Sequence, residues 1–155
     1  LCIRNIENGI LSPGLSSAPV GSHFNFSGPH GYFTFRPSIR PAVFVATGTG
    51  LAPFVSMARS GVTGFILLHG VKSAENHYYA SVFKSTAKQY VPCISDTDRS
   101  SGAYFRGHVT DYLRKNLAPG LYYFYQCGHR DMIRDVTLLV DEKFSGSFIF
   151  TEIFY

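Results

Sequence analysis

The sequence predicts an α/β fold in which a five-stranded parallel sheet carries helices on both faces, preceded by small β structure. Three observations lead to this prediction. From Ala42 onward, continuous apolar runs alternate with segments of helical spacing, which is typical of parallel strands that are covered on both sides. A glycine-rich turn follows the first of these runs. Before Phe35, short apolar stretches are instead cut by turn residues, which indicates small antiparallel structure.

The predicted elements of the larger, second part alternate along the chain. Strands are predicted, in order, at residues 42–47, 64–70, 90–95, 121–127 and 147–155. Helices are predicted between them at residues 51–60, 75–90, 107–116 and 129–144. Right-handed crossovers would place these helices on both faces of the sheet. The segment from Arg36 to Pro41 is polar and holds two prolines, and it therefore marks the predicted domain boundary.

Length and composition limit the class of protein. With 155 residues, of which 45% are hydrophobic and 15% charged, the chain can fill one core of ordinary size. The net charge of +4 comes from 14 scattered Lys and Arg residues, which favours an anionic cofactor or an acidic partner over nucleic acid. No apolar run reaches the roughly 18 residues of a membrane span. Three isolated cysteines and six histidines without ligand spacing predict a cytoplasmic protein with no disulfide framework and no metal site.

The glycine-rich turn is the first candidate binding site. It follows a buried strand directly and reads Thr47, Gly48, Thr49, Gly50, Leu51, Ala52, Pro53. Glycine allows a positive φ and a close approach of a diphosphate to the backbone, and a helix N-terminus offers free N–H groups and a positive dipole. Proline fits the first turn of a helix. A tight turn without a ligand is the alternative interpretation of this motif alone.

Four further motifs accompany the turn in a fixed order. They are Gly9-Ile10-Leu11-Ser12, then Gly28-Pro29-His30-Gly31-Tyr32-Phe33, then Cys127-Gly128 with Met132, and last Glu152-Ile153-Phe154-Tyr155. Together with the turn, this ordered set resembles the ferredoxin-NADP reductase family of flavoproteins, over nearly the whole chain.

The resemblance implies an FAD-dependent NAD(P)H oxidoreductase that passes hydride from nicotinamide to FAD and electrons on to a ferredoxin-like or other redox protein. Residues 1–37 would be the last part of a truncated FAD-binding domain, a partial antiparallel β-barrel, and residues 38–155 a Rossmann-like NAD(P)-binding domain. By the same resemblance, Gly9, Ile10, Leu11 and Ser12 would contact FAD, and Thr47 would reach toward the flavin.

The implied site of hydride transfer lies where the strand at residues 121–127 ends. Cys127 would pack near the reacting nicotinamide carbon without acting as a nucleophile, since the cofactors carry the chemistry; an inert buried cysteine is the alternative. Gly128 and Met132 follow it at the start of a helix. The resemblance makes Glu152 the carboxylate that orients nicotinamide, with a solvated charge as the alternative. It makes Phe154 the aromatic residue stacked on the flavin, with Tyr155 as the competing candidate.

The choice between NAD and NADP is expected after the third strand, where the sequence reads Ser95-Asp96-Thr97-Asp98-Arg99. A 2′-phosphate needs Arg or Lys, whereas free ribose hydroxyls suit a carboxylate. Two carboxylates therefore favour NAD. Arg99 and Arg106 keep NADP open, and an acidic surface loop with no ligand is a further alternative.

The sequence also departs from the family pattern. The chain holds only the last third of the expected barrel, and we expect it to be a fragment of a longer reductase. Unpaired barrel strands would expose edges and apolar faces, which predicts dimerisation of such a fragment. The alternative function is a nicotinamide-binding electron-transfer subunit or sensing module without independent turnover.

Overall fold

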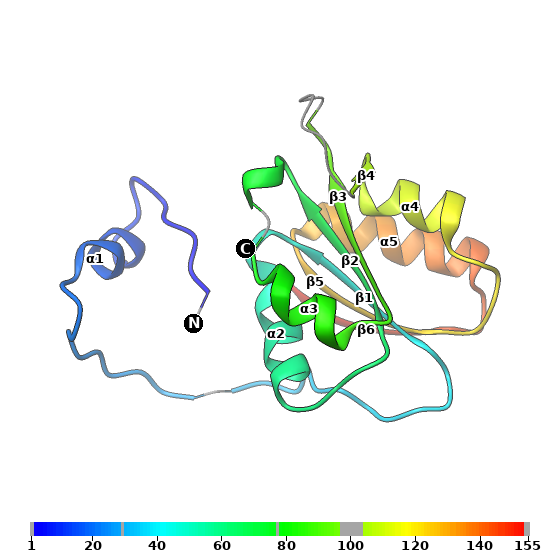
Figure 1. The fold of residues 1–155 in the computed structure, drawn as a ribbon, viewed down its shortest axis with the longest axis horizontal. Helices are drawn as coiled ribbons and strands as arrows, with labels where there is room; N and C mark the ends of the chain where they lie inside the picture. Colours follow the sequence, from blue (N-terminus) through cyan, green and yellow to red (C-terminus); the bar gives the residue numbers. More distant parts are fainter. Residues whose placement is uncertain (1, 29, 77, 97–103, 154–155) are drawn as a thin grey trace. The chain divides into compact units, whose positions relative to one another are not determined.

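The computed structural model describes residues 2–28, 30–76, 78–96 and 104–153. The chain divides into two compact units, Leu1–Tyr32 and Phe33–Tyr155 (Figure 1). The second unit starts before the proline-rich segment that marks the predicted boundary, because the side chains of Phe33 and Phe35 pack against its core.

The second unit is built on a parallel sheet with the strand order β4-β3-β2-β1-β5-β6. The strands are β1 (Ala42–Thr47), β2 (Ile66–Val71), β3 (Gln89–Ile94), β4 (Phe105–Arg106), β5 (Tyr123–Gly128) and β6 (Phe148–Ile153). Five of them confirm the predicted strands. The sixth, β4, is a two-residue addition that pairs Phe105 with Cys93 and Arg106 with Ile94. Helices lie between β1 and β2, β2 and β3, β4 and β5, and β5 and β6, and such crossover connections allow strands to run parallel.

Helices cover both faces of this sheet, as predicted (Figure 1). They are α2 (Ala52–Arg59), α3 (Ala80–Thr86), α4 (Val109–Asn116) and α5 (Arg130–Lys143), with short 3₁₀ turns η1 (Gly48–Leu51) and η2 (Ala74–Asn76). The predicted helix at residues 75–90 is wrong in extent, since only α3 and η2 form within it. Tyr79 has a left-handed backbone with φ of 57°, which interrupts the helical path before α3.

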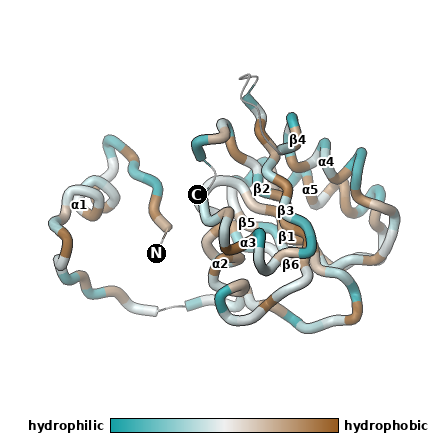
Figure 2. Tube along the Cα trace, viewed as in Figure 1, coloured by the Kyte–Doolittle hydropathy of each residue, from teal (hydrophilic) through white to brown (hydrophobic). Residues whose placement is uncertain are grey.

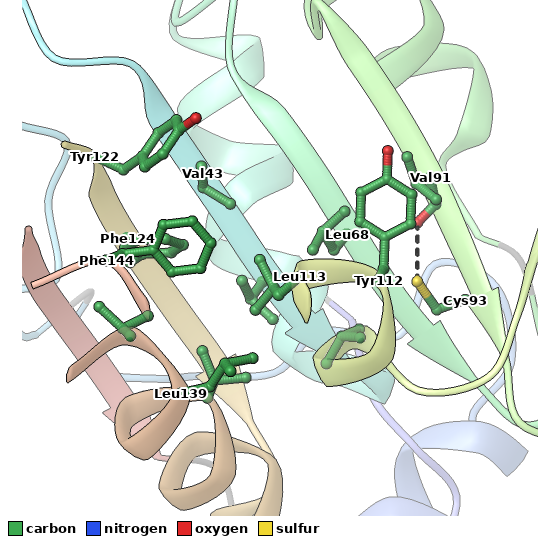
Figure 3. Close-up of a cluster of buried hydrophobic side chains, with 14 residues drawn as sticks. Val43, Leu68, Val91, Cys93, Tyr112, Leu113, Tyr122, Phe124, Leu139 and Phe144 are labelled. Atoms are coloured by element: carbon green, nitrogen blue, oxygen red, sulfur yellow. Dashed lines mark hydrogen bonds between the residues drawn. The ribbon is translucent and has the colours of Figure 1, made fainter. Parts of the chain in front are cut away.

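Each face of the sheet has its own hydrophobic core. Residues of α4 and α5 pack on one face against Val43, Leu68 and Phe124 (Figure 3). Hydrophobic residues recur at intervals of three or four along both helices, between hydrophilic ones, which is why one side of each is buried (Figure 2). On the other face, α2 and α3 cover a stack in which the Phe44 ring lies 4.6 Å from that of Phe54 and 4.3 Å from that of Phe65.

A segment that we call the strap, residues 33–40, completes the second core. Tyr125, in β5, binds it: the Tyr125 hydroxyl accepts the N–H of Arg36 at 3.0 Å. The guanidinium carbon of Arg36 lies 4.8 Å from the centre of the Phe150 ring in β6. The strap therefore covers the β5–β6 part of the sheet with aromatic and cation–π contacts.

The first unit contains the helix α1 (Leu11–Ser17) and, among its described residues 2–28 and 30–32, no strand. The predicted partial barrel is therefore not confirmed. A barrel strand forms only when a neighbouring strand satisfies its N–H and C=O groups, and the described residues of this unit supply none. Its apolar side chains stay exposed, as at Ile10 and Val20. In the described residues of the whole chain, no helix is long and apolar enough to cross a membrane.

Candidate functional site

The candidate site lies at the carboxyl edge of the sheet, where the adjacent strands β1 and β5 end. Ala46 pairs with Cys127, so Thr47 and Gly128 leave the sheet side by side. The glycine turn forms η1 immediately after β1 and runs into α2, with Pro53 in the first turn of that helix. Open α/β sheets bind their ligands at this edge, between strands whose connections diverge.

The hydroxyl of Thr47 decides how the turn is capped. Thr47 is the N-cap residue of η1, yet its side chain makes no cap hydrogen bond there. Its oxygen instead accepts the backbone N–H of His129 at 3.0 Å, across the gap between β1 and β5. The start of η1 is thus left without a side-chain acceptor for its N–H groups. Such a helix start is suited to hold a phosphate.

The two glycines of the turn have different roles. A Cβ at Gly50 would overlap the carbonyl oxygen of Cys127 and lie 2.6 Å from the Cα of Gly128. A Cβ at Gly128, where φ is +138°, would in turn lie 2.8 Å from the carbonyl oxygen of Thr47. Gly48 has a φ of +53°, and a Cβ there would meet nothing within 4 Å. Gly50 and Gly128 therefore pack two turns together, whereas the space beside Gly48 is open.

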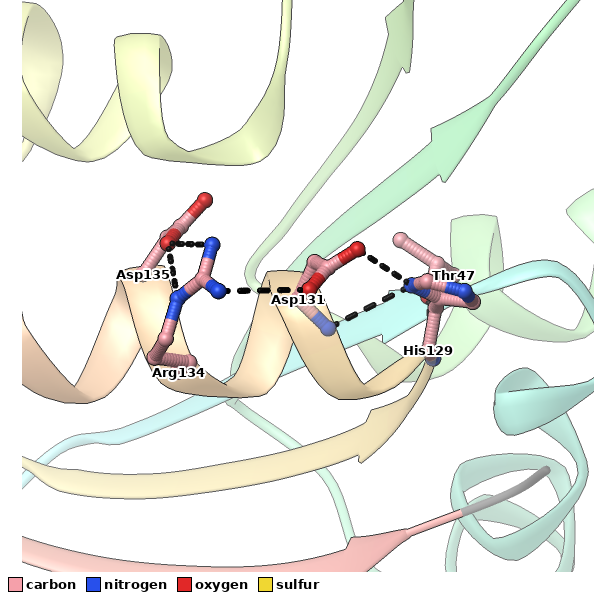
Figure 4. A network of polar contacts seen from close by, with 5 residues as sticks. All are labelled: Thr47, His129, Asp131, Arg134 and Asp135. Carbon is pink, nitrogen blue, oxygen red and sulfur yellow. Dashed lines mark hydrogen bonds and ion pairs between the residues drawn. The ribbon is translucent and has the colours of Figure 1, made fainter.

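Two other helices that begin at this edge carry side-chain caps. In α4, the carboxylate of Asp111 accepts the N–H of His108 at 2.9 Å. In α5, the Nδ1 atom of His129 accepts the N–H of Asp131 at 3.3 Å. From there, a polar network continues along α5 to Arg134 and Asp135 (Figure 4). The η1 turn has no such side-chain cap, and the starts of α2 and α3 have none either.

Cys127 is fully buried in the core beneath the turn. Burial, and to a lesser extent the nearby Glu152, raise the pKa of its thiol from 9.0 to about 12. A thiol that keeps its proton at neutral pH is a poor nucleophile. In the strand register, Cys127 stands opposite Glu152 of β6, which is half-buried. The neutral thiol of Cys127 and the carboxylate of Glu152 thus lie on neighbouring strands, near the carboxyl edge of the sheet.

The remaining predicted residues of this unit fall near the same edge or in its core. Leu51 is buried. The half-buried residues are Thr49, Ala52, Pro53 and Met132. Ser95 and Asp96 are exposed after β3, where Asp96 donates its N–H to the carbonyl of Lys72 at 3.0 Å. Thr97, Asp98, Arg99, Phe154 and Tyr155 lie outside the described residues.

The proposed FAD contacts belong to the first unit. The hydroxyl of Ser12 accepts the N–H of Ile6 at 3.0 Å, and the N–H of Gly9 binds the carbonyl of Ile6 at 2.8 Å. These bonds fold Gly9, Ile10, Leu11 and Ser12 into a turn that opens α1, whose start has no side-chain cap. A hollow of about 280 Å³ adjoins Ser12 and is lined by Ile3, Asn5, Ser12, Leu15 and Ser16.

Sequence reasoning missed one buried polar residue close to the site. Gln126 is fully buried in β5, directly before Cys127. A polar residue inside the apolar run LYYFYQC is the signal that could have revealed it. Among the described residues, no group of three or more His, Cys, Asp or Glu side chains could hold a metal ion.

Comparison with known proteins identifies the family. Residues 44–137 match the model of the oxidoreductase NAD-binding domain, which is more than half of the 155 residues. The chain belongs to this family. The match begins in β1 and ends within α5, so it contains both glycine turns of the candidate site.

Two relatives confirm the resemblance to ferredoxin-NADP reductase-like proteins. The chain is 30% identical over 148 residues to the 2-halobenzoate 1,2-dioxygenase electron transfer component of Burkholderia cepacia, covering 86% of this chain and 43% of the relative. It is 31% identical over 147 residues to the toluate 1,2-dioxygenase electron transfer component of Pseudomonas putida, covering 87% and 43%. The chain thus spans less than half the length of these relatives.

Solved structures share the fold. A cytochrome P450 reductase from Amycolatopsis superposes with a TM-score of 0.75 at 25% identity, over 98% of this chain and 50% of that one. A ferredoxin reductase in carbazole 1,9a-dioxygenase has a TM-score of 0.78 at 20% identity, over 99% and 50%. These matches support the α/β architecture described above.

Proposed function

We propose that the chain binds a pyridine dinucleotide at the η1 turn and is part of an FAD-dependent NAD(P)H oxidoreductase of the ferredoxin reductase type. One observation carries the proposal: the Thr47 hydroxyl accepts the N–H of His129 and therefore does not cap the N–H groups of η1. These N–H groups lie beside the open space at Gly48. Family membership supports it, since the matching model is an NAD-binding domain.

The dinucleotide diphosphate would bind the N–H groups at the start of η1, where the helix dipole adds a favourable field. The nicotinamide would then lie over the Cys127–Gly128 turn. There the protonated thiol of Cys127 would lie buried beneath the contact surface, and Glu152 offers a carboxylate that can accept a hydrogen bond from the carboxamide. Met132 and Gly128 would complete this surface. The residues bind and orient; they form no covalent intermediate.

For the flavin, we propose Gly9, Ile10, Leu11 and Ser12 as contacts to the diphosphate, on the basis of the resemblance and of the turn that they form before α1. FAD supplies the hydride acceptor when bound and releases electrons singly. Phe154 is proposed to stack on its ring, with Tyr155 as the competing residue. The acceptor proposed for the electrons is a redox protein, because the relatives named above are electron transfer components of dioxygenases.

The complete gene product that contains this chain allows a direct test. Its absorption spectrum is recorded before and after addition of NADH in the absence of oxygen. A yellow protein that bleaches supports the oxidoreductase. A colourless protein that binds NADH in a titration supports the alternative, a binding module without turnover. A protein that neither bleaches nor binds refutes both.

NAD is the preferred dinucleotide in this proposal. Asp96 is exposed at the end of β3, where a carboxylate would repel a 2′-phosphate. Arg106, exposed in β4, is the residue that would favour NADP instead. The test is the ratio of kcat/KM for NADH to that for NADPH, which Asp96→Asn should lower by roughly tenfold, or about 1.4 kcal/mol. Asp141→Asn, an exposed carboxylate on α5, is the matched control and should leave the ratio unchanged.

A further inference from the structure

Gln126 links three elements from inside the sheet. Its side chain is fully buried on the face that packs against α4 and α5. Its Nε2 atom donates to Thr137 of α5 at 2.7 Å and to Thr151 of β6 at 3.0 Å. Its Oε1 atom is buried and finds no hydrogen-bond partner among the described residues. The amide therefore depends on the two threonine hydroxyls.

The position of Thr151 is specific because β6 is an edge strand of repetitive sequence. Gln126 stands opposite Thr151, Tyr125 opposite Phe150, and Cys127 opposite Glu152. A slip of β6 by two residues would preserve which side chains face which side of the sheet. It would also keep a phenylalanine opposite Tyr125, with Phe148 in the place of Phe150. Aromatic packing alone therefore discriminates poorly between the two registers.

The same slip would be costly at Gln126. It would place Ile149 opposite the amide, and isoleucine can accept no hydrogen bond. The buried amide would lose one of its two acceptors, which is disfavoured inside an apolar core. The slip would also bring Phe150 opposite Cys127, where Glu152 stands in the observed register.

We propose that the Gln126–Thr151 hydrogen bond locks the register of β6 and thereby positions Glu152 opposite Cys127, which makes Gln126 a positioning residue for hydride transfer. The functional half of this proposal rests on the proposed function, whereas the register half does not. A buried polar side chain that specifies register at the expense of stability is a known use of such groups, and Gln126 is the buried member of this pair.

Hydrogen exchange of the complete gene product tests the register. The variants are Gln126→Met, which keeps the approximate length of the side chain, and Thr151→Val, which removes its acceptor in β6. Both should speed the exchange of the β6 amides that face β5 by at least tenfold, because slipping breaks those bonds, while amides of β1 and β2 keep their rates. Thr137→Val removes the acceptor in α5 alone and should leave β6 at wild-type rates.

Two outcomes overturn the register lock. One is wild-type exchange of β6 in either Gln126→Met or Thr151→Val. The other is equal acceleration throughout the sheet, which would mean general destabilisation. Since Thr151→Val changes an exposed side chain, it keeps the test available if Gln126→Met fails to fold.

Stopped-flow reduction by NADH tests the functional half. Gln126→Met and Thr151→Val should lower the limiting rate of flavin reduction at least fivefold and leave the KM for NADH within twofold, because the η1 turn is untouched. Thr137→Val should keep the wild-type rate. An unchanged limiting rate in variants with fast β6 exchange overturns the positioning role and leaves the register lock standing. A wild-type protein that NADH does not reduce refutes the proposed function, and the exchange data then still decide the register lock.

Discussion

Replacement of Gly50 by alanine tests the packing of the two glycine turns most directly. The new Cβ would lie 2.6 Å from the Cα of Gly128 and would overlap the carbonyl oxygen of Cys127, whereas ordinary contacts begin at 3.4 Å. Overpacking costs about 1–3 kcal/mol where side chains can move aside. Here the obstacle is backbone, so the ends of β1 and β5 must separate. We expect Gly50→Ala to lower the free energy of unfolding by about 3 kcal/mol or more.

Gly48→Ala is the matched control within the same turn. Its Cβ would meet nothing within 4 Å, so only the positive φ of +53° opposes alanine. That backbone penalty is about 1 kcal/mol. If Gly48 provides the open face for the diphosphate, however, the added methyl should weaken NADH binding by about tenfold or more, or about 1.4 kcal/mol. The two variants should thus separate stability from binding.

Urea and thermal unfolding of the complete gene product measure the effect on stability, and titration with NADH measures the effect on binding. Gly50→Ala should lower the midpoint of thermal unfolding by roughly 10 °C, and Gly48→Ala should lower it by a few degrees. The reasoning is refuted if both variants lose the same free energy of unfolding within about 0.5 kcal/mol. Unchanged NADH affinity in Gly48→Ala would instead remove the phosphate role of that residue.

Three further predictions concern groups at or near the site. The pKa of Cys127 is raised from 9.0 to about 12 in the folded state, so between pH 9 and pH 12 only the unfolded thiol ionises. The free energy of unfolding should therefore fall as the pH rises through this range. Denaturant titrations at pH 8 and pH 11 should show a smaller fall in Cys127→Ala than in the wild-type protein. Tyr125→Phe should cost about 1 kcal/mol by freeing the N–H of Arg36, and faster proteolysis within the strap should accompany it; an unchanged cleavage rate would contradict this role. Thr47→Val should cost about 1 kcal/mol by leaving the N–H of His129 without its acceptor, whereas Thr47→Ser should retain most of that stability, as chemical denaturation can determine.

Most of the sheet could be predicted because its strands are buried on both faces. β1 forms over the predicted residues 42–47, since its apolar run has no competing helical period. β4 could not be predicted, because two residues carry no period and the strand exists only by pairing with β3. The short extent of α3 depends on the backbone of Tyr79, and nothing in its residue type signals a left-handed conformation.

The parts of the candidate site that are short sequence motifs could be predicted, whereas the contacts between segments distant in sequence could not. The glycine turn and Cys127–Gly128 are visible as motifs, and the structure brings them together at one edge. The division of roles between Gly48 and Gly50 could not be read from the sequence, because it depends on a carbonyl oxygen far along the chain. Thr47 was expected to face the flavin, and its bond to His129 emerges only once β1 and β5 pair.

The contact between the two turns also determines how this domain can be rebuilt from parts of its relatives. Gly50, Thr47 and Gly128 fit against one another so closely that neither turn has room to vary by itself. A chimera that takes the β1 turn from one parent and the β5 turn from another would combine surfaces that were shaped separately. The two segments, distant in sequence, therefore behave as one unit in recombination, and chimeras that take both turns from the same parent should be more stable than chimeras that mix them.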